Sequence, residues 1–171
     1  MRATSSSRAA RRRPSSTASI TRRSTLKVVL TPGKNVKRYV AGALNARSGK
    51  VVHVVAERKN SELFLALVDA LRRAYRRAKR IHLVLDNFII HKSRRTLRHL
   101  AGLDGRVVLH FLPPYSPESN LIERLWKQLH DHVTRNHTHR AIEPLLEAVD
   151  EFIEVAQPFP GTQVSVLARA A

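Results

Sequence analysis

The 171-residue sequence carries 31 Lys and Arg residues against 13 Asp and Glu, a formal net charge of +18. It has no cysteine, which excludes a disulfide framework and a thiolate metal site, and no apolar run reaches the roughly 18 to 20 residues that span a membrane. The charge predicts a polyanionic partner, most often nucleic acid. A solvated basic surface, ribosomal-type packing or attraction to a membrane surface would also account for it.

The first third of the chain holds much of this charge. Thirteen Lys and Arg residues precede Glu57, the first acidic residue. Residues 1–24 are rich in Ser, Thr, Ala and Arg without hydrophobic periodicity, so we expect a disordered basic leader. A mitochondrial transit peptide has a similar composition but needs an amphipathic stripe. After the leader, residues 25–30 predict a short strand, and residues 37–45 and 50–57 predict a hairpin.

Helices and strands then alternate. The expected helices cover about 61–75, 93–103, 120–135 and 141–156, and the expected strands cover 81–85 and 106–112. The first of these helices begins at Asn60 or Ser61, and Trp126 lies on the apolar stripe of the third. The order predicts an α/β domain over residues 25–156 with an antiparallel edge and a parallel centre. Residues 157–171 form a tail without a clear pattern.

Two carboxylates have both a structural and a catalytic interpretation. Asp86 follows an expected central strand, where ligands gather in open α/β sheets, but it would equally cap the next turn. Glu123 lies in the first turn of a helix, where a capping box with Asn120 explains it well. Together the two residues predict a site for Mg²⁺ or Mn²⁺, because a divalent cation relieves the repulsion between neighbouring carboxylates.

Polar and basic residues follow Asp86 directly. His91 either shapes the rim of a site or packs inside the turn. A basic cluster next to it would contact DNA phosphates or form a solvated helix face. The cluster consists of Lys92, Arg94, Arg95 and Arg98.

Three segments resemble the mariner-related transposases of bacterial insertion sequences, which are DDE superfamily endonucleases. DNFIIHKS, at residues 86–93, is similar to their DN-x-x-x-H-x-S box. LPPYSPESNLIERLWK, at residues 112–127, is similar to their LPPYSPELNPIERLWK signature, which is highly specific. PGKNVKRY and AGALN resemble the region around their second strand. The resemblance covers about residues 31–155, the C-terminal and larger part of the catalytic domain.

The resemblance implies a ribonuclease-H-like mixed sheet flanked by helices, and DNA strand cleavage and transfer with Mg²⁺ or Mn²⁺. It assigns Asp86 and Glu123 as the second and third metal-binding, catalytic carboxylates, with Asn87, His91 and Asn120 on the rim of the active site. The implied partners are transposon ends, target DNA, and further copies of the chain or a full-length transposase. We expect a bacterial cytoplasmic protein associated with the nucleoid.

The sequence departs from the family pattern in two places. Leu121 replaces a proline, which we expect to matter little because the proline only presets the helix. The first catalytic aspartate is absent, since residues 1–56 contain no Asp or Glu and Glu57 follows a later strand. The first strand and the family's helix-turn-helix region are therefore expected to be missing. A truncated or frameshifted element, or a misassigned start, explains this pattern.

Two other functions remain open on the sequence alone. A non-catalytic DNA-binding remnant of a transposase is the main alternative. A stand-alone nuclease of the same fold, such as a junction resolvase, has only fold analogy in its favour.

Overall fold

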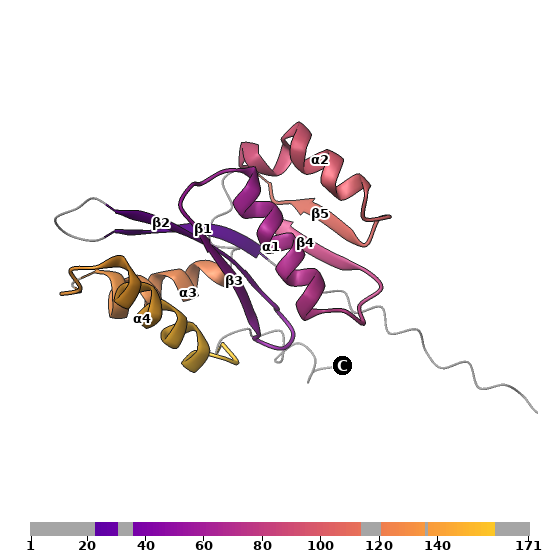
Figure 1. Cartoon of the computed structure of the whole chain (residues 1–171). Coiled ribbons are helices and arrows are strands. Elements are labelled where there is room, and N and C mark those ends of the chain that lie inside the picture. The colour runs from indigo at the N-terminus through magenta and orange to yellow at the C-terminus, as the bar shows by residue number, and fades with distance from the viewer. Residues whose placement is uncertain (1–22, 31–35, 114–120, 136, 160–171) are drawn as a thin grey trace, which may run out of the picture.

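The computed structural model describes residues 23–30, 36–113, 121–135 and 137–159 (Figure 1). Five strands in this part of the chain form one sheet: β1 (Arg23–Leu30), β2 (Lys37–Leu44), β3 (Val51–Ala56), β4 (Ile81–Leu85) and β5 (Val107–Phe111). Their order is β3-β2-β1-β4-β5. The first three strands pair antiparallel, and β4 pairs parallel with both β1 and β5. The expected antiparallel edge and parallel centre are confirmed.

The central strand β1 corrects one prediction. The expectation that the fold's first strand is missing is wrong, because β1 occupies the position between β2 and β4. It extends the strand expected at residues 25–30 by two residues toward the N-terminus, into the end of the expected leader. The strand is present, and its sequence RSTLKVVL contains no Asp or Glu. Residues 1–22 lie outside the described part of the chain, so their disorder stays a prediction.

Among the described residues, four α-helices flank the sheet: α1 (Ser61–Ala74), α2 (Arg94–Ala101), α3 (Leu121–Leu129) and α4 (Ile142–Val155). The first begins at Asn60, whose side chain accepts a hydrogen bond from the Leu63 amide at 3.1 Å. Ser93 begins α2 in the same way through the Thr96 amide. The expected helix over 120–135 is divided, since α3 ends at Leu129 and a π-helical segment, His130–Thr134, follows it. None of the described helices is long and apolar enough to cross a bilayer.

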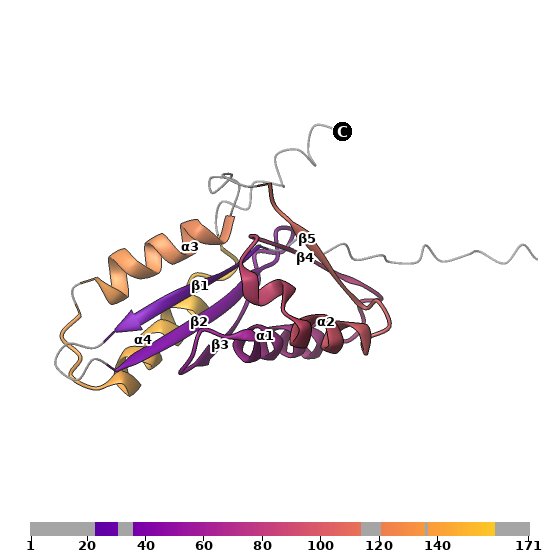
Figure 2. The same ribbon diagram turned by 90° about the horizontal axis from the view of Figure 1, so that it is seen from above.

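The sheet separates two cores, with α1 and α2 on one side and α3 and α4 on the other (Figures 1 and 2). Side chains along β2 point alternately into the two cores. Val40 and Leu44 pack with α3 and α4, while Ala41 and Ala43 pack with α1. Trp126 of α3 is 2% exposed, which confirms its predicted place in the core.

Gly42 allows α3 to lie close against the sheet. A methyl group at this position would come within 2.7 Å of Trp126 Cζ2 and 3.5 Å of Ile122 Cδ1. The indole ring therefore rests on the backbone of β2, and α3 lies over the β1–β2 part of the sheet. This contact fixes the first turn of α3, where Glu123 is found.

The C-terminal side of the described chain is attached to the hairpin. Phe159 is buried, and its amide donates a hydrogen bond to the Gly49 carbonyl at 3.0 Å. The side chain of Gln157 accepts a hydrogen bond from the Val51 amide. The beginning of the expected tail therefore belongs to the core, while residues 160–171 lie outside the described structure.

Candidate catalytic site

Asp86 directly follows β4, at the edge of the sheet where parallel strands end. Its side chain is 51% exposed and accepts hydrogen bonds from His91 Nε2 at 3.1 Å and from the Phe88 amide at 3.4 Å. His91 lies behind it in the short 3₁₀ segment Ile89–Lys92, only 3% exposed, with its ring 4.5 Å from that of Phe64. His91 therefore packs inside the turn and contacts Asp86 from the interior.

The surroundings of Asp86 favour its ionised form. The hydrogen bond from His91 lowers the pKa of Asp86, and this outweighs the opposing effect of burial. The charge of His91, the Phe88 amide and the charge of Lys59 lower this pKa further. Lys59 lies before α1, with its ammonium 4.1 Å from the centre of the Phe88 ring. No sequence pattern indicates a role for Lys59, since 27 residues separate it from Asp86.

In the metal-free protein, His91→Leu should raise the pKa of Asp86, because leucine fills the space beside Phe64 without donating a hydrogen bond. A pKa that folding lowers contributes stability above the unfolded pKa, and the contribution is lost as pH falls through the folded pKa. The variant should therefore lose part of this contribution at neutral pH, a small effect because half of the Asp86 side chain is exposed.

Carbon-13 NMR titration of the Asp86 carboxyl group measures this shift. His99→Leu is the control, because His99 approaches Asp69 instead of Asp86. The same Asp86 pKa in the wild type and in His91→Leu would contradict the role given to His91.

Asn87 connects the Asp86 turn to the neighbouring strand. Its amide nitrogen donates to the Leu112 carbonyl at 2.8 Å, and its side-chain oxygen accepts from Lys92 Nζ at 2.7 Å. The Lys92 ammonium also lies 4.5 Å from the centre of the Phe111 ring. Asn87 and Lys92 therefore fix the ends of β4 and β5 next to Asp86.

Glu123 lies in the first turn of α3 and is partly exposed. The preceding residue, Ile122, lies over Gly42, and the backbone of Gly42 pairs with that of Thr25. Pairing of Ser24 with Leu85 in the parallel direction places Thr25 next to Asp86. The first turn of α3 and Asp86 are thus about two strand spacings apart across the sheet, roughly 10 Å. Asn120, expected to cap this helix and to lie on the rim, falls outside the described residues.

The register also shows which residue of β1 lies between the two predicted carboxylates. Thr25 occupies the place in the central strand between Asp86 on β4 and Gly42 under α3. In the described part of the chain, no group of three His, Asp or Glu side chains is arranged to hold a metal ion. The two predicted carboxylates therefore flank a position in β1 where the chain has a hydroxyl residue instead of an acid.

The expected DNA-binding cluster is divided by the fold. Lys92 belongs to the Asp86 turn, while the three arginines lie at the start of α2 and along it. Arg95 forms an ion pair with Glu62 at 2.7 Å, and both side chains are exposed. Arg94 and Arg98 are also exposed, so they remain available to a phosphate backbone.

The sheet order and the helices on both faces define a ribonuclease-H-like fold, and solved structures with this fold match the chain. The catalytic domain of Mos1 mariner transposase superposes with a TM-score of 0.62 and 17% identity, covering 81% of this chain and 71% of that one. The catalytic core domain of BIV integrase gives 0.56 and 16%, covering 90% and 99%.

The sequence model of the DDE superfamily endonucleases matches residues 6–146, and the chain belongs to this family. A curated relative, the insertion element IS630 uncharacterized 39 kDa protein of Shigella sonnei, is 47% identical over 135 residues. The match covers 79% of this chain and 39% of that protein, so the chain spans well under half of its relative's length. The family match begins inside the segment expected to be a leader.

Proposed function

We propose that the chain acts on DNA in transposition, and that its Asp86 and Glu123 are the second and third carboxylates of a DDE site. The observation that carries this proposal is the geometry of the two elements. Asp86 follows the parallel strand β4, and Glu123 lies in the first turn of α3, which packs over Gly42 two strands away. Metal-dependent DNA strand cleavage and transfer is the reaction proposed for the family's complete site.

Carboxylate oxygens suit Mg²⁺ or Mn²⁺. Related catalytic cores were solved with these ions, the HTLV-2 integrase core with magnesium and the Mos1 catalytic domain with Mn. Asp86 fits such a role because it is ionised, half exposed and supported from behind by His91. When bound, divalent ions activate the attacking oxygen and stabilise the leaving oxygen on either side of the phosphate.

The donor set of this chain fits one ion better than two. Two-metal chemistry requires ligands for both ions about 4 Å apart, and β1 contributes no carboxylate between Asp86 and α3. We therefore expect no DNA cleavage by this chain alone. The same observation favours the second candidate function, a DNA-binding transposase remnant that occupies DNA ends or joins a full-length transposase without cutting.

A Mn²⁺ titration of the whole chain, followed by calorimetry, tests the proposed pair. The wild type should show one weak site, and Asp86→Asn or Glu123→Gln should weaken it severalfold by removing a charged ligand. Cleavage of a duplex carrying the element's ends should stay at background in all three proteins.

Glu147→Gln is the control, because it removes an exposed carboxylate from α4, outside the site. It should leave Mn²⁺ binding unchanged. If Asp86→Asn and Glu123→Gln bind Mn²⁺ like the wild type, neither residue is a metal ligand. Asp86 would then only cap its turn, and Glu123 would only cap its helix. Clear cleavage by the wild-type chain would show that another residue supplies the third carboxylate.

A further inference from the structure

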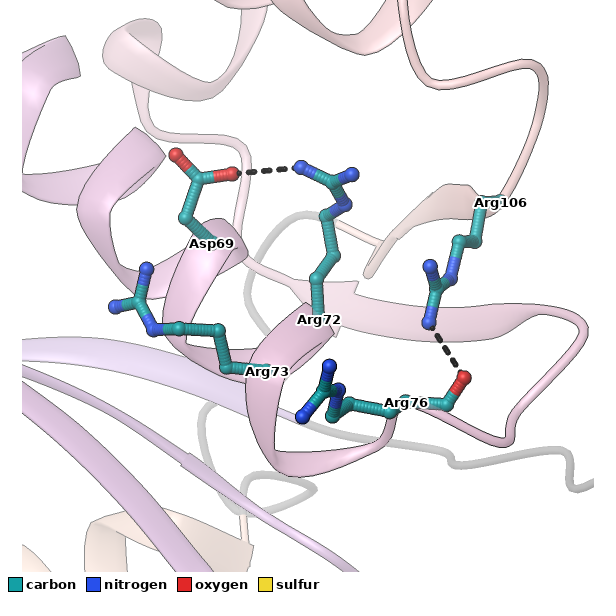
Figure 3. Close-up of a pocket in the computed structure, with 5 residues that line it drawn as sticks. All are labelled: Asp69, Arg72, Arg73, Arg76 and Arg106. Carbon is teal, nitrogen blue, oxygen red and sulfur yellow. Dashed lines mark hydrogen bonds and ion pairs between the residues drawn. The ribbon is translucent and has the colours of Figure 1, made fainter.

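A basic pocket lies away from the predicted catalytic carboxylates, Asp86 and Glu123. A pocket with a volume of about 620 Å³ is lined by four arginines and one aspartate (Figure 3). Asp69, Arg72 and Arg73 come from the last turns of α1, Arg76 follows this helix, and Arg106 immediately precedes β5. Four guanidinium groups against one carboxylate give this small surface a strong positive potential.

The pocket has a position of its own in the fold. The Arg106 carbonyl accepts a hydrogen bond from the Ile81 amide, so Arg106 lies at the beginning of β4, whereas Asp86 follows its end. The five residues of β4 separate these ends by about 16 Å. The pocket is backed by α1, while α3 carries Glu123 on the opposite face of the sheet. A group bound here therefore does not belong to the carboxylate site.

Two of the arginines are held in place. One terminal nitrogen of Arg106 donates to the main-chain carbonyls of Tyr75 at 3.3 Å and Arg76 at 3.0 Å. Arg72 donates to Asp69 at 3.1 Å. Both side chains nevertheless keep a buried Nε–H group without a hydrogen-bond partner in the described structure. Their partly buried positive charge is offset only in part by these contacts, and an anion in the pocket would stabilise it electrostatically.

The single carboxylate does not cancel the positive charge. Asp69 is already engaged by Arg72, and His99 Nε2 approaches it at 3.4 Å, an ion-pair distance without hydrogen-bond geometry. Arg73 and Arg76 are exposed, and their guanidinium groups have no partner among the described residues. Planar guanidinium groups bind phosphate oxygens through paired hydrogen bonds.

We propose that this pocket binds the phosphate backbone of DNA, in a segment other than the one at the carboxylates. Arg72 and Arg106 form its rigid floor, and Arg73 and Arg76 close on the phosphate from solvent. The volume accommodates a phosphate with its adjoining sugar. This inference rests on the proposed function in one respect, the choice of DNA as the polyanion. Contact with the DNA phosphate backbone requires neither a metal ion nor Asp86 and Glu123.

Arg73→Gln/Arg76→Gln tests the pocket by fluorescence anisotropy on a 20-base-pair duplex in EDTA, at about 50 to 200 mM salt. The control, Arg47→Gln/Arg140→Gln, removes the same charge from two exposed arginines elsewhere. The pocket variant should bind at least about fivefold more weakly and the control less than about twofold. The salt slope should fall by about 0.9 for each phosphate that the variant no longer neutralises.

Nitrogen-15 NMR of the arginine Nε groups gives an independent readout on the wild-type chain. The duplex should shift the Nε–H signals of Arg72 and Arg106. Equal weakening of both double variants, or shifts with inorganic phosphate but not with the duplex, would overturn the pocket and leave the proposed function intact. A wild-type chain that does not bind the duplex would overturn both.

Discussion

Thr25→Asp should tighten Mn²⁺ binding about tenfold, or about 1.4 kcal/mol. The register places this residue beside Asp86 and opposite Gly42, so an acid there would add a third carboxylate between β4 and α3. Calorimetric titration of the variant and the wild type measures the change. Metal-dependent nicking of a supercoiled plasmid should then rise above background, since ligands for a second ion become available.

Two variants separate the carboxylate from other effects of the substitution. Thr25→Asn has nearly the same shape without the charge and should bind Mn²⁺ like the wild type. Thr25→Asp/Asp86→Asn should lose most of the gain, because the two carboxylates act on the same ion. Tighter binding in Thr25→Asn, or an undiminished gain in the double variant, would show that the new acid does not complete the predicted site.

Trp126→Ala should lower the free energy of unfolding by about 3 to 5 kcal/mol, the usual cost of removing a large buried aromatic side chain. Trp126 is 2% exposed, and it packs in the core that joins α3 and α4 to the sheet. Urea denaturation followed by circular dichroism measures the loss. Gln128→Ala, an exposed position on the same helix, should change stability by less than about 0.5 kcal/mol.

The contact with β2 makes this prediction more specific. Gly42→Ala should cost about 1 to 3 kcal/mol, because the added methyl group meets the indole ring at 2.7 Å. In Trp126→Leu the ring is absent, so adding Gly42→Ala to that variant should cost much less. Strictly additive losses in this double-mutant cycle would mean that α3 does not rest on Gly42.

Local sequence determined most of the helices and strands and both candidate carboxylates. The hairpin, β4 and α1 follow from hydrophobic periodicity and from capping by Asn60, signals that lie within a few residues of each other. Asp86 and Glu123 each lie in a short motif that reads along the chain, and the motif around Glu123, at residues 112–127, is highly specific. The same motifs indicated the ribonuclease-H-like class and the family.

The tertiary structure decided what depends on distant pairing. The chain from Arg23 to Leu30 has no signal of its own for a central position, and it obtains that position by pairing with β4 about sixty residues later. The sequence therefore suggested a missing strand, whereas only the acid is absent from it. His91 supports Asp86 because Phe64 of α1 packs against its ring, a contact that hydrophobic burial selects across 27 residues.

The arginine pocket has the same origin. The run of basic residues in and after α1 is visible in the sequence, but it fits a solvated helix face equally well. Arg106 joins that run because β5 pairs with β4 and brings position 106 next to the carbonyls that follow α1. Sheet formation, driven by burial of both faces, places these charges together, and periodicity within a single segment carries no information about it.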